Sequence, residues 1–169
     1  KGFHGQMGMF VRALAYMMSH GADGLRQVAE DAVLNANYLL AGLKDSLTPA
    51  YPGPCMHEVL FDDGFLEDTG VTTLDFAKAM IDEGFHPMTM YFPLVVHGAL
   101  LMEPTETESK ATLDQFIRTV KGLAERARAG DARHFKDAPR LTPRRRLDET
   151  AAARNPVLVW RPPPAQAAE

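Results

Sequence analysis

Two histidines and three glutamates crowd into residues 84–109, the stretch GFHPMTMYFPLVVHGALLMEPTETES. Imidazole and carboxylate groups are the side chains used most for general acid–base catalysis and for metal binding. His86 precedes a proline, which biases its backbone to an extended form, and His97 stands near an expected turn. This stretch is therefore the first candidate for a functional site.

A metal centre is not expected in this sequence. Zinc needs three or four ligands at one site, and no two histidines have the i,i+4 spacing of a helix. His57 and Glu58 are neighbours on an expected strand, so their side chains should point to opposite faces and could not bind one ion together. The standard catalytic signatures (nucleophile elbow, phosphate loop, dinucleotide fingerprint, zinc-protease motif and CxxC) are also missing.

The acidic segment EPTETES, residues 103–109, has two interpretations. The first is a helix that opens at Thr105, with Glu108 as the capping-box acid and Glu106 favoured by the positive end of the helix dipole. The second places Glu103 or Glu106 at the edge of a cleft, because a strand that feeds a helix N-terminus is a common position for a site.

Apolar residues that recur every three or four positions predict four helices, and short apolar runs bounded by turn residues predict three strands. Thr72 and Asp75 resemble a capping box, Gly84 supplies a left-handed helix end, and the proline-rich residues 48–55 should form a loop. The expected helices span residues 10–19, 25–43, 73–83 and 105–127, and the expected strands span residues 57–62, 88–92 and 98–102.

This order predicts an α/β (α+β) fold with a short mixed sheet and helices packed on one face. We expect the folded domain to cover residues 1–135. Residues 136–169 are rich in proline and arginine, and they are interpreted as a docking tail whose apolar island at residues 157–160 carries Trp160 as an anchor.

The composition argues against several classes of function. A formal net charge of −4 argues against general nucleic-acid binding, which normally needs a basic face. No apolar run is long enough to span a bilayer, so no membrane role is expected. A single cysteine, Cys55, allows no internal disulfide and fits a reducing, cytoplasmic setting.

Four stretches resemble one family, and together they cover nearly the whole chain. They are similar to the C-terminal region of glycine dehydrogenase (decarboxylating), the P-protein of the glycine cleavage system, in the subunit 2 form of the split bacterial enzymes. The four stretches are FHGQMGMFVRALAYM, AEDAVLNANYLLAGL, GVTTLDFAKAMIDEGFHPMTMYFPLVVHGALLMEPTETESKATLDQFI and RLDETAAARNPVLVW.

The resemblance implies the small C-terminal domain of a fold type I pyridoxal-phosphate enzyme, which closes over the cleft of a larger cofactor-binding domain. The family reaction decarboxylates glycine through a Schiff base with the cofactor and passes the aminomethyl group to the lipoyl arm of the H-protein. The implied partners are the upstream cofactor-binding domain of the same subunit, P-protein subunit 1, lipoylated H-protein and glycine, without nucleic acid or membrane.

The resemblance also gives candidates for the substrate side of that cleft. They lie in the matching stretches and are polar where apolar residues would suffice, and no individual role is assigned to them. These candidates are His4, His57, His86, Glu103, Thr105 and Glu106.

The Schiff-base lysine of the family is not expected in this chain. In the family it precedes a histidine, a glycine-rich run and a proline, upstream of the region that matches here, and none of the six lysines of this sequence has that context. We therefore expect no catalytic residue in these residues and no cofactor bound to them alone. The alternatives are a stand-alone, non-catalytic docking module and a domain of another fold type I decarboxylase.

Pyridoxal phosphate added to this chain alone should give no specific, borohydride-reducible absorbance band, because a covalent electron sink needs its own lysine. Absorbance spectroscopy before and after reduction tests this. A reducible band at one to one stoichiometry would show that a lysine of this chain serves the cofactor after all.

Overall fold

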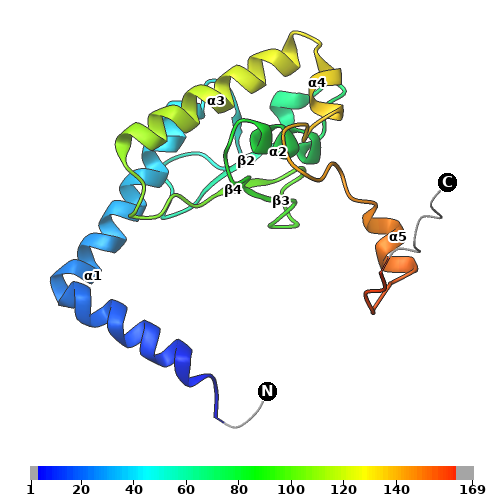
Figure 1. Ribbon diagram of the computed structural model, residues 1–169. Coiled ribbons are helices and arrows are strands. Elements are labelled where there is room, and N and C mark those ends of the chain that lie inside the picture. The colour runs from blue at the N-terminus through cyan, green and yellow to red at the C-terminus, as the bar shows by residue number, and fades with distance from the viewer. Residues whose placement is uncertain (1–3, 163–169) are drawn as a thin grey trace.

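A four-stranded sheet in the order β1-β2-β4-β3 lies at the centre of the computed structural model, which describes residues 4–162 (Figure 1). All three pairings are antiparallel, although a mixed sheet was expected. The loops after β1 and β3 each reverse the chain between two neighbouring strands. The strands are β1 (Thr48–Pro49), β2 (Val59–Asp62), β3 (Thr89–Met90) and β4 (Leu100–Met102).

The strand predictions are right in position but too long at β2, β3 and β4, and they miss β1. Residues 48–55 were expected to be loop throughout, yet Thr48 pairs with Asp62 and Pro49 with Phe61. Pro49 is tolerated because β1 is an edge strand, where the missing backbone N–H breaks no ladder.

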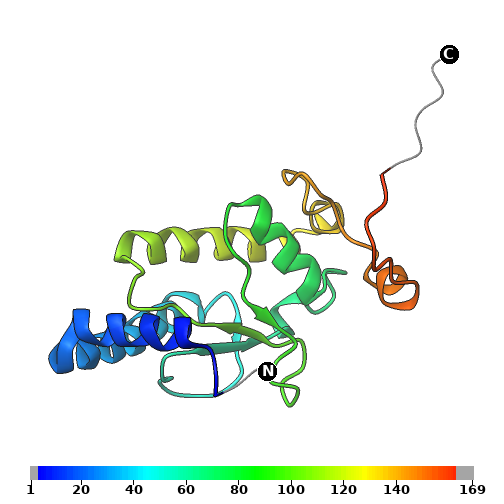
Figure 2. The ribbon, with the colours of Figure 1, turned by 60° about the horizontal axis from the view of Figure 1, so that its bottom comes forward.

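The helices cover one face of this sheet, as the sequence predicts. In β2 and β4 the buried side chains of Val59, Phe61, Leu100 and Met102 alternate with half-exposed neighbours, so only one face is covered. Figure 2 shows α2 and α3 lying above the sheet. The helical elements are α1 (Met7–Leu43), the 3-10 turn η1 (Gly64–Leu66), α2 (Thr73–Asp82), α3 (Lys110–Arg128), α4 (Ala132–Lys136) and α5 (Glu149–Arg154).

Helix α1 is broken at Gly21, where the backbone takes φ 65° and ψ −175°. The sequence predicts two helices separated by HGADG, and the structure places a kink between two helical halves at that point. The second half packs on the body through Ala36, Leu39 and Leu43, whereas the first half projects away from it (Figure 1). Gly42 permits the close approach of α3, because an added Cβ would lie 2.5 Å from Ile117 Cδ1.

The expected capping box of α2 is confirmed. The Asp75 backbone N–H donates to Thr72 Oγ1 (3.2 Å), and the Thr72 backbone N–H donates to Asp75 Oδ2 (3.0 Å). Gly84 follows the helix with φ 84°, which is the left-handed conformation that the sequence predicts there.

The expected start of α3 at Thr105 is wrong. The helix begins at Lys110 and is capped by Ser109, whose hydroxyl accepts from the Thr112 backbone N–H (3.1 Å). The apolar stripe of α3 starts only at Leu113, so burial requires no earlier turn of helix. Consequently, no acidic residue lies in the first turn of α3, and Glu106 precedes the helix, so attraction to the positive end of the helix dipole does not explain its position.

Two buried carboxylates of α2 hold the segment that follows α4. The Asp75 and Asp82 side chains are each only 3% exposed. Asp75 pairs with Lys136 Nζ (2.5 Å) and Arg146 Nη1 (2.8 Å). Asp82 accepts from the backbone N–H groups of Arg140 and Leu141 (2.7 and 2.8 Å to Oδ1). Residues 136–146 are thus attached to the body, and the docking role of the remaining tail stays a prediction.

Asp75→Asn should destabilise the chain by about 2 kcal/mol near neutral pH. Burial opposes ionisation of this carboxyl, but Lys136, the Thr72 backbone and hydroxyl, and Arg146 outweigh it and lower its pKa to about 2. A depressed carboxyl pKa stabilises the fold above the unfolded value of about 4 and loses that contribution as pH falls towards 2. Urea unfolding across this pH range measures the difference.

Asp137→Asn is the matched control, because it removes an exposed i,i+4 pair with Arg133 (3.4 Å) that should contribute below about 1 kcal/mol. Equal losses for the two variants, or a loss at Asp75 that does not shrink on acidification, would contradict this account of the segment.

Candidate functional site

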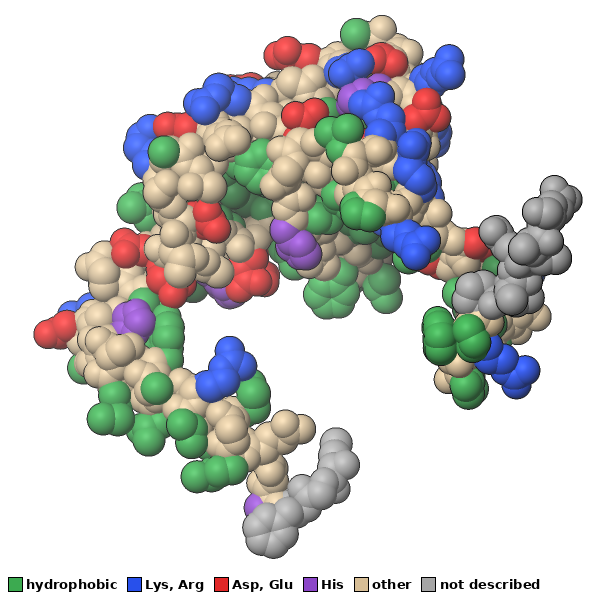
Figure 3. Space-filling view, viewed as in Figure 1, with side chains coloured by type: hydrophobic (Ala, Val, Ile, Leu, Met, Phe, Trp, Pro, Cys, Tyr) green, Lys and Arg blue, Asp and Glu red, His purple; other side chains and the backbone are tan. Residues whose placement is uncertain are grey.

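A cavity of about 460 Å³ lies between α1, α3 and the β3–β4 edge of the sheet. Apolar side chains form much of its wall, namely Leu39, Phe85, Met88, Leu101, Met102, Leu113 and Phe116. Polar side chains also line it, namely His86, Thr89, Glu103, Thr105, Glu108 and Thr112. Figure 3 shows acidic side chains gathered at the end of the body from which the first half of α1 leaves, and basic ones around α4 at the other end.

Three of the six sequence candidates line this cavity. His86 follows Gly84 and precedes β3, while Glu103 and Thr105 follow β4. Because β3 and β4 are antiparallel neighbours, the start of one and the end of the other lie at the same end of the sheet. The topology therefore brings together residues that are 17 to 19 positions apart in the chain.

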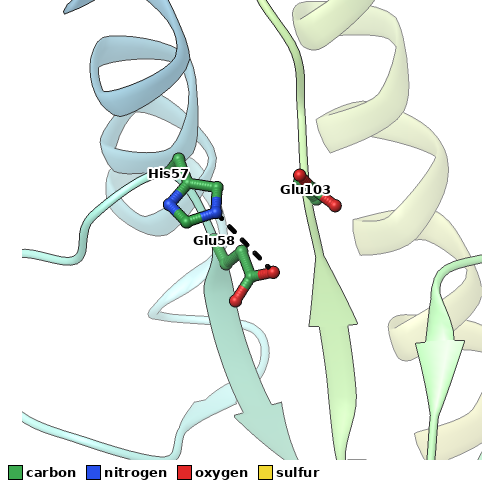
Figure 4. A group of neighbouring side chains, drawn as sticks. All are labelled: His57, Glu58 and Glu103. Carbon is green, nitrogen blue, oxygen red and sulfur yellow. Dashed lines mark ion pairs between the residues drawn. The ribbon is translucent and has the colours of Figure 1, made fainter. Parts of the chain in front are cut away.

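The other candidates lie outside the cavity wall. His4 is exposed before the start of α1. Glu106 accepts a hydrogen bond from the Tyr16 hydroxyl (2.8 Å), and this bond raises the pKa of Tyr16. His57 lies at a neighbouring corner of the sheet, where it approaches Glu58 and Glu103 (Figure 4).

The prediction that His57 and Glu58 point to opposite faces is wrong. Side chains alternate only within a strand, and His57 lies in a bend because β2 begins at Val59. His57 Nε2 and Glu58 Oε1 are 3.8 Å apart, and one ligand-type atom each of His57, Glu58 and Glu103 lies within 4.8 Å of the other two.

This corner does not have the dimensions of a formed zinc site. Bonds of about 2.1 Å in a tetrahedral centre place neighbouring ligand atoms about 3.4 Å apart, so these side chains would have to close in to share an ion. His57 and Glu103 are also exposed to solvent. The absence of a metal centre therefore stays a prediction.

Two glutamates face each other at this corner. Val59 pairs with Met102, so the antiparallel register places Glu58 opposite Glu103 one step beyond the last paired residues. Like charges directly opposite each other are unfavourable unless a cation or a proton offsets them. Of these two only Glu103 lines the cavity, where Glu108 is a second carboxylate, so the cavity wall favours a positively charged group.

Asn35 and Asn37 on α1 anchor the two segments that carry these acids. The Asn35 amide Nδ2 donates to the Thr105 carbonyl (2.9 Å) and more weakly to that of Glu108 (3.5 Å). Asn37 donates to the Cys55 carbonyl (2.7 Å) and accepts from its backbone N–H (3.0 Å). Sequence reasoning missed both roles, although two polar residues in an apolar stripe were an available signal.

The cavity does not fit pyridoxal phosphate on its own residues. A phosphate needs N–H donors or cations, and the covalent link needs a lysine amine. Within residues 4–162, neither lysine nor arginine lines this cavity, while two glutamates do. Lys110, at the start of α3, is committed to Asp114 (2.7 Å), and Lys136 is committed to Asp75.

Between residues 4 and 162, no helix has both the length and the apolar composition needed to cross a membrane.

The fold and the cavity define an α+β domain with an acidic, half-apolar pocket, and no lysine is among the described residues that line it. Residues 28–140 match the family model described as "Glycine dehydrogenase, C-terminal domain". The chain belongs to this family.

Curated relatives agree with this assignment. The chain is 74% identical over 161 residues to the "Probable glycine dehydrogenase (decarboxylating) subunit 2" of Caulobacter vibrioides. The matched region covers 95% of the chain and 31% of that relative. Proteins of the same description from Kosmotoga olearia and Staphylococcus haemolyticus are each 49% identical, over 96% and 95% of the chain and 34% and 32% of their own lengths. The chain thus spans about a third of the length of these relatives.

Asn35→Ala should speed amide hydrogen exchange in residues 104–109 and leave residues 53–58 unchanged, and Asn37→Ala should do the reverse. Each substitution removes the hydrogen bonds that tie one segment to α1, at a cost of about 1 kcal/mol. Peptide-resolved exchange measured by mass spectrometry compares the two variants, and each one is the control of the other. Faster exchange of both segments in both variants would mean that α1 as a whole had loosened.

Proposed function

We propose that this chain is the C-terminal part of subunit 2 of glycine dehydrogenase (decarboxylating) and that its cavity forms one wall of the substrate cleft. The observation that carries this proposal is the meeting of His86, Glu103 and Thr105 at one cavity in a chain of this family. The small sheet with helices on one face is compatible with a domain that closes over a cofactor domain of fold type I.

Pyridoxal phosphate belongs, in this proposal, to the part of the subunit outside this chain. The chain's own residues would act on the substrate side. Glu103 and Glu108 would attract the amino group of glycine, and His86 can donate or accept one hydrogen bond at the rim. The partners are subunit 1, the lipoylated H-protein and the upstream domain, in a cytoplasmic setting that suits a chain with one cysteine.

His86→Ala in the complete enzyme should lower glycine decarboxylation at least about tenfold while the melting temperature stays within about 2 °C, because an exposed rim side chain contributes to the site more than to the core. Glycine–bicarbonate exchange with H-protein measures the activity, and calorimetry measures the stability.

His97→Ala is the matched control. His97 is also exposed, but it pairs with Asp63 (2.8 Å) and does not line the cavity. Unchanged activity in the His86 variant, or an equal loss in the two variants, would refute the proposed role of this wall.

A further inference from the structure

The first half of α1, residues 7–20, is an exposed helix made largely of apolar residues; we refer to it as the arm. Met18 is 75% exposed, Met7 is 70% exposed and Phe10 is 56% exposed. The only Lys, Arg, Asp or Glu residue in this segment is Arg12. The other large apolar side chains exposed here are those of Met9, Val11, Leu14, Tyr16 and Met17.

These apolar side chains do not share a single face of the arm. At about 100° per residue, Val11, Leu14 and Met18 fall on one side, while Met9 and Tyr16 fall on the opposite side. A helix that is apolar on opposite sides is normally enclosed within a core. A flat docking surface or one second helix would cover only half of the arm.

The arm lies outside the compact body of the chain. The family model for the C-terminal domain starts at residue 28, and the first buried residue of α1 is Ala36. The kink at Gly21 separates the two halves (Figure 1). The domain that the family match defines and the body that burial defines therefore both begin after the kink.

The relatives supply enough additional chain to enclose the arm. Since the matched regions occupy about a third of each relative, about two thirds of a full-length subunit 2 lies outside them. We propose that residues 7–20 form a core helix of the preceding domain of the full-length subunit and that Gly21 is the joint between the two domains. This inference rests on the proposed function in one respect, namely that the chain is part of such a subunit.

One hydrogen bond connects the arm to the body across the kink. The Tyr16 hydroxyl of the arm donates to Glu106 (2.8 Å), and Glu106 lies next to Thr105 in the cavity wall. A domain built around the arm would therefore stand beside the acidic rim of the cavity. That is the position from which it could complete the cleft.

Cysteine alkylation in the full-length holo-subunit tests the enclosure. Met9→Cys and Leu14→Cys report on opposite sides of the arm, and Glu125→Cys on the outer side of α3 is the matched exposed control. Peptide mass spectrometry gives each rate relative to the same site in the guanidinium-unfolded subunit. Both arm positions should react at least about 100-fold more slowly than the control, since a core helix reacts only through local opening.

Several outcomes would overturn the proposal. Fast alkylation at either arm position would show that at least one side stays open, and protection that disappears on dilution would identify a second copy as the occupant. If a cysteine variant does not fold, native-state hydrogen exchange of the unsubstituted subunit replaces the alkylation test. The proposal requires the amides of residues 7–20 to exchange as slowly as those of α2, and faster exchange would overturn it. None of these readouts requires turnover, so they are independent of the His86 experiment.

Discussion

The antiparallel pairing of β2 with β4 is the contact on which the rest of the structure depends. It places Val59 opposite Met102 and makes every second side chain of both strands part of one buried face. Helices α2, α3 and the second half of α1 bury their apolar stripes against that face and against one another. The pairing ends where Glu58 and Glu103 meet, and the charged corner beside the cavity is therefore a consequence of the register.

Polar side chains fix the conformation of the loops, which apolar packing alone cannot do. Hydrophobic burial fixes how close α1 and α3 come to the sheet, but it does not select one conformation for the loops beside them. Asn35 and Asn37 supply that selection on one side, and Asp75 and Asp82 supply it on the other. Each holds backbone or charged groups of a distant segment, so loop geometry near the cavity depends on a few directional bonds.

Local signals in the sequence predicted local structure well. The capping box of Thr72, the stop at Gly84 and the break near Gly21 each depend on neighbouring residues, and all three are present. Local signals failed where contacts with distant segments decide the conformation. The start of α3 was set too early at Thr105, whose carbonyl is bonded to α1, and pairing with Asp62 and Phe61 turns the first residues of a predicted loop into a strand.

The site was predictable in composition and only partly in geometry. Residue types and motif matches pointed to His86, Glu103 and Thr105, but only the strand order shows that they share a cavity wall. The attachment of residues 136–146 to α2 has a different consequence, for the design of shorter versions of the chain. Shortening at residue 135 would leave Asp75 with only its capping-box bonds to Thr72 and would remove the backbone N–H groups that Asp82 binds, whereas shortening after residue 147 would spare the bonds of both carboxylates.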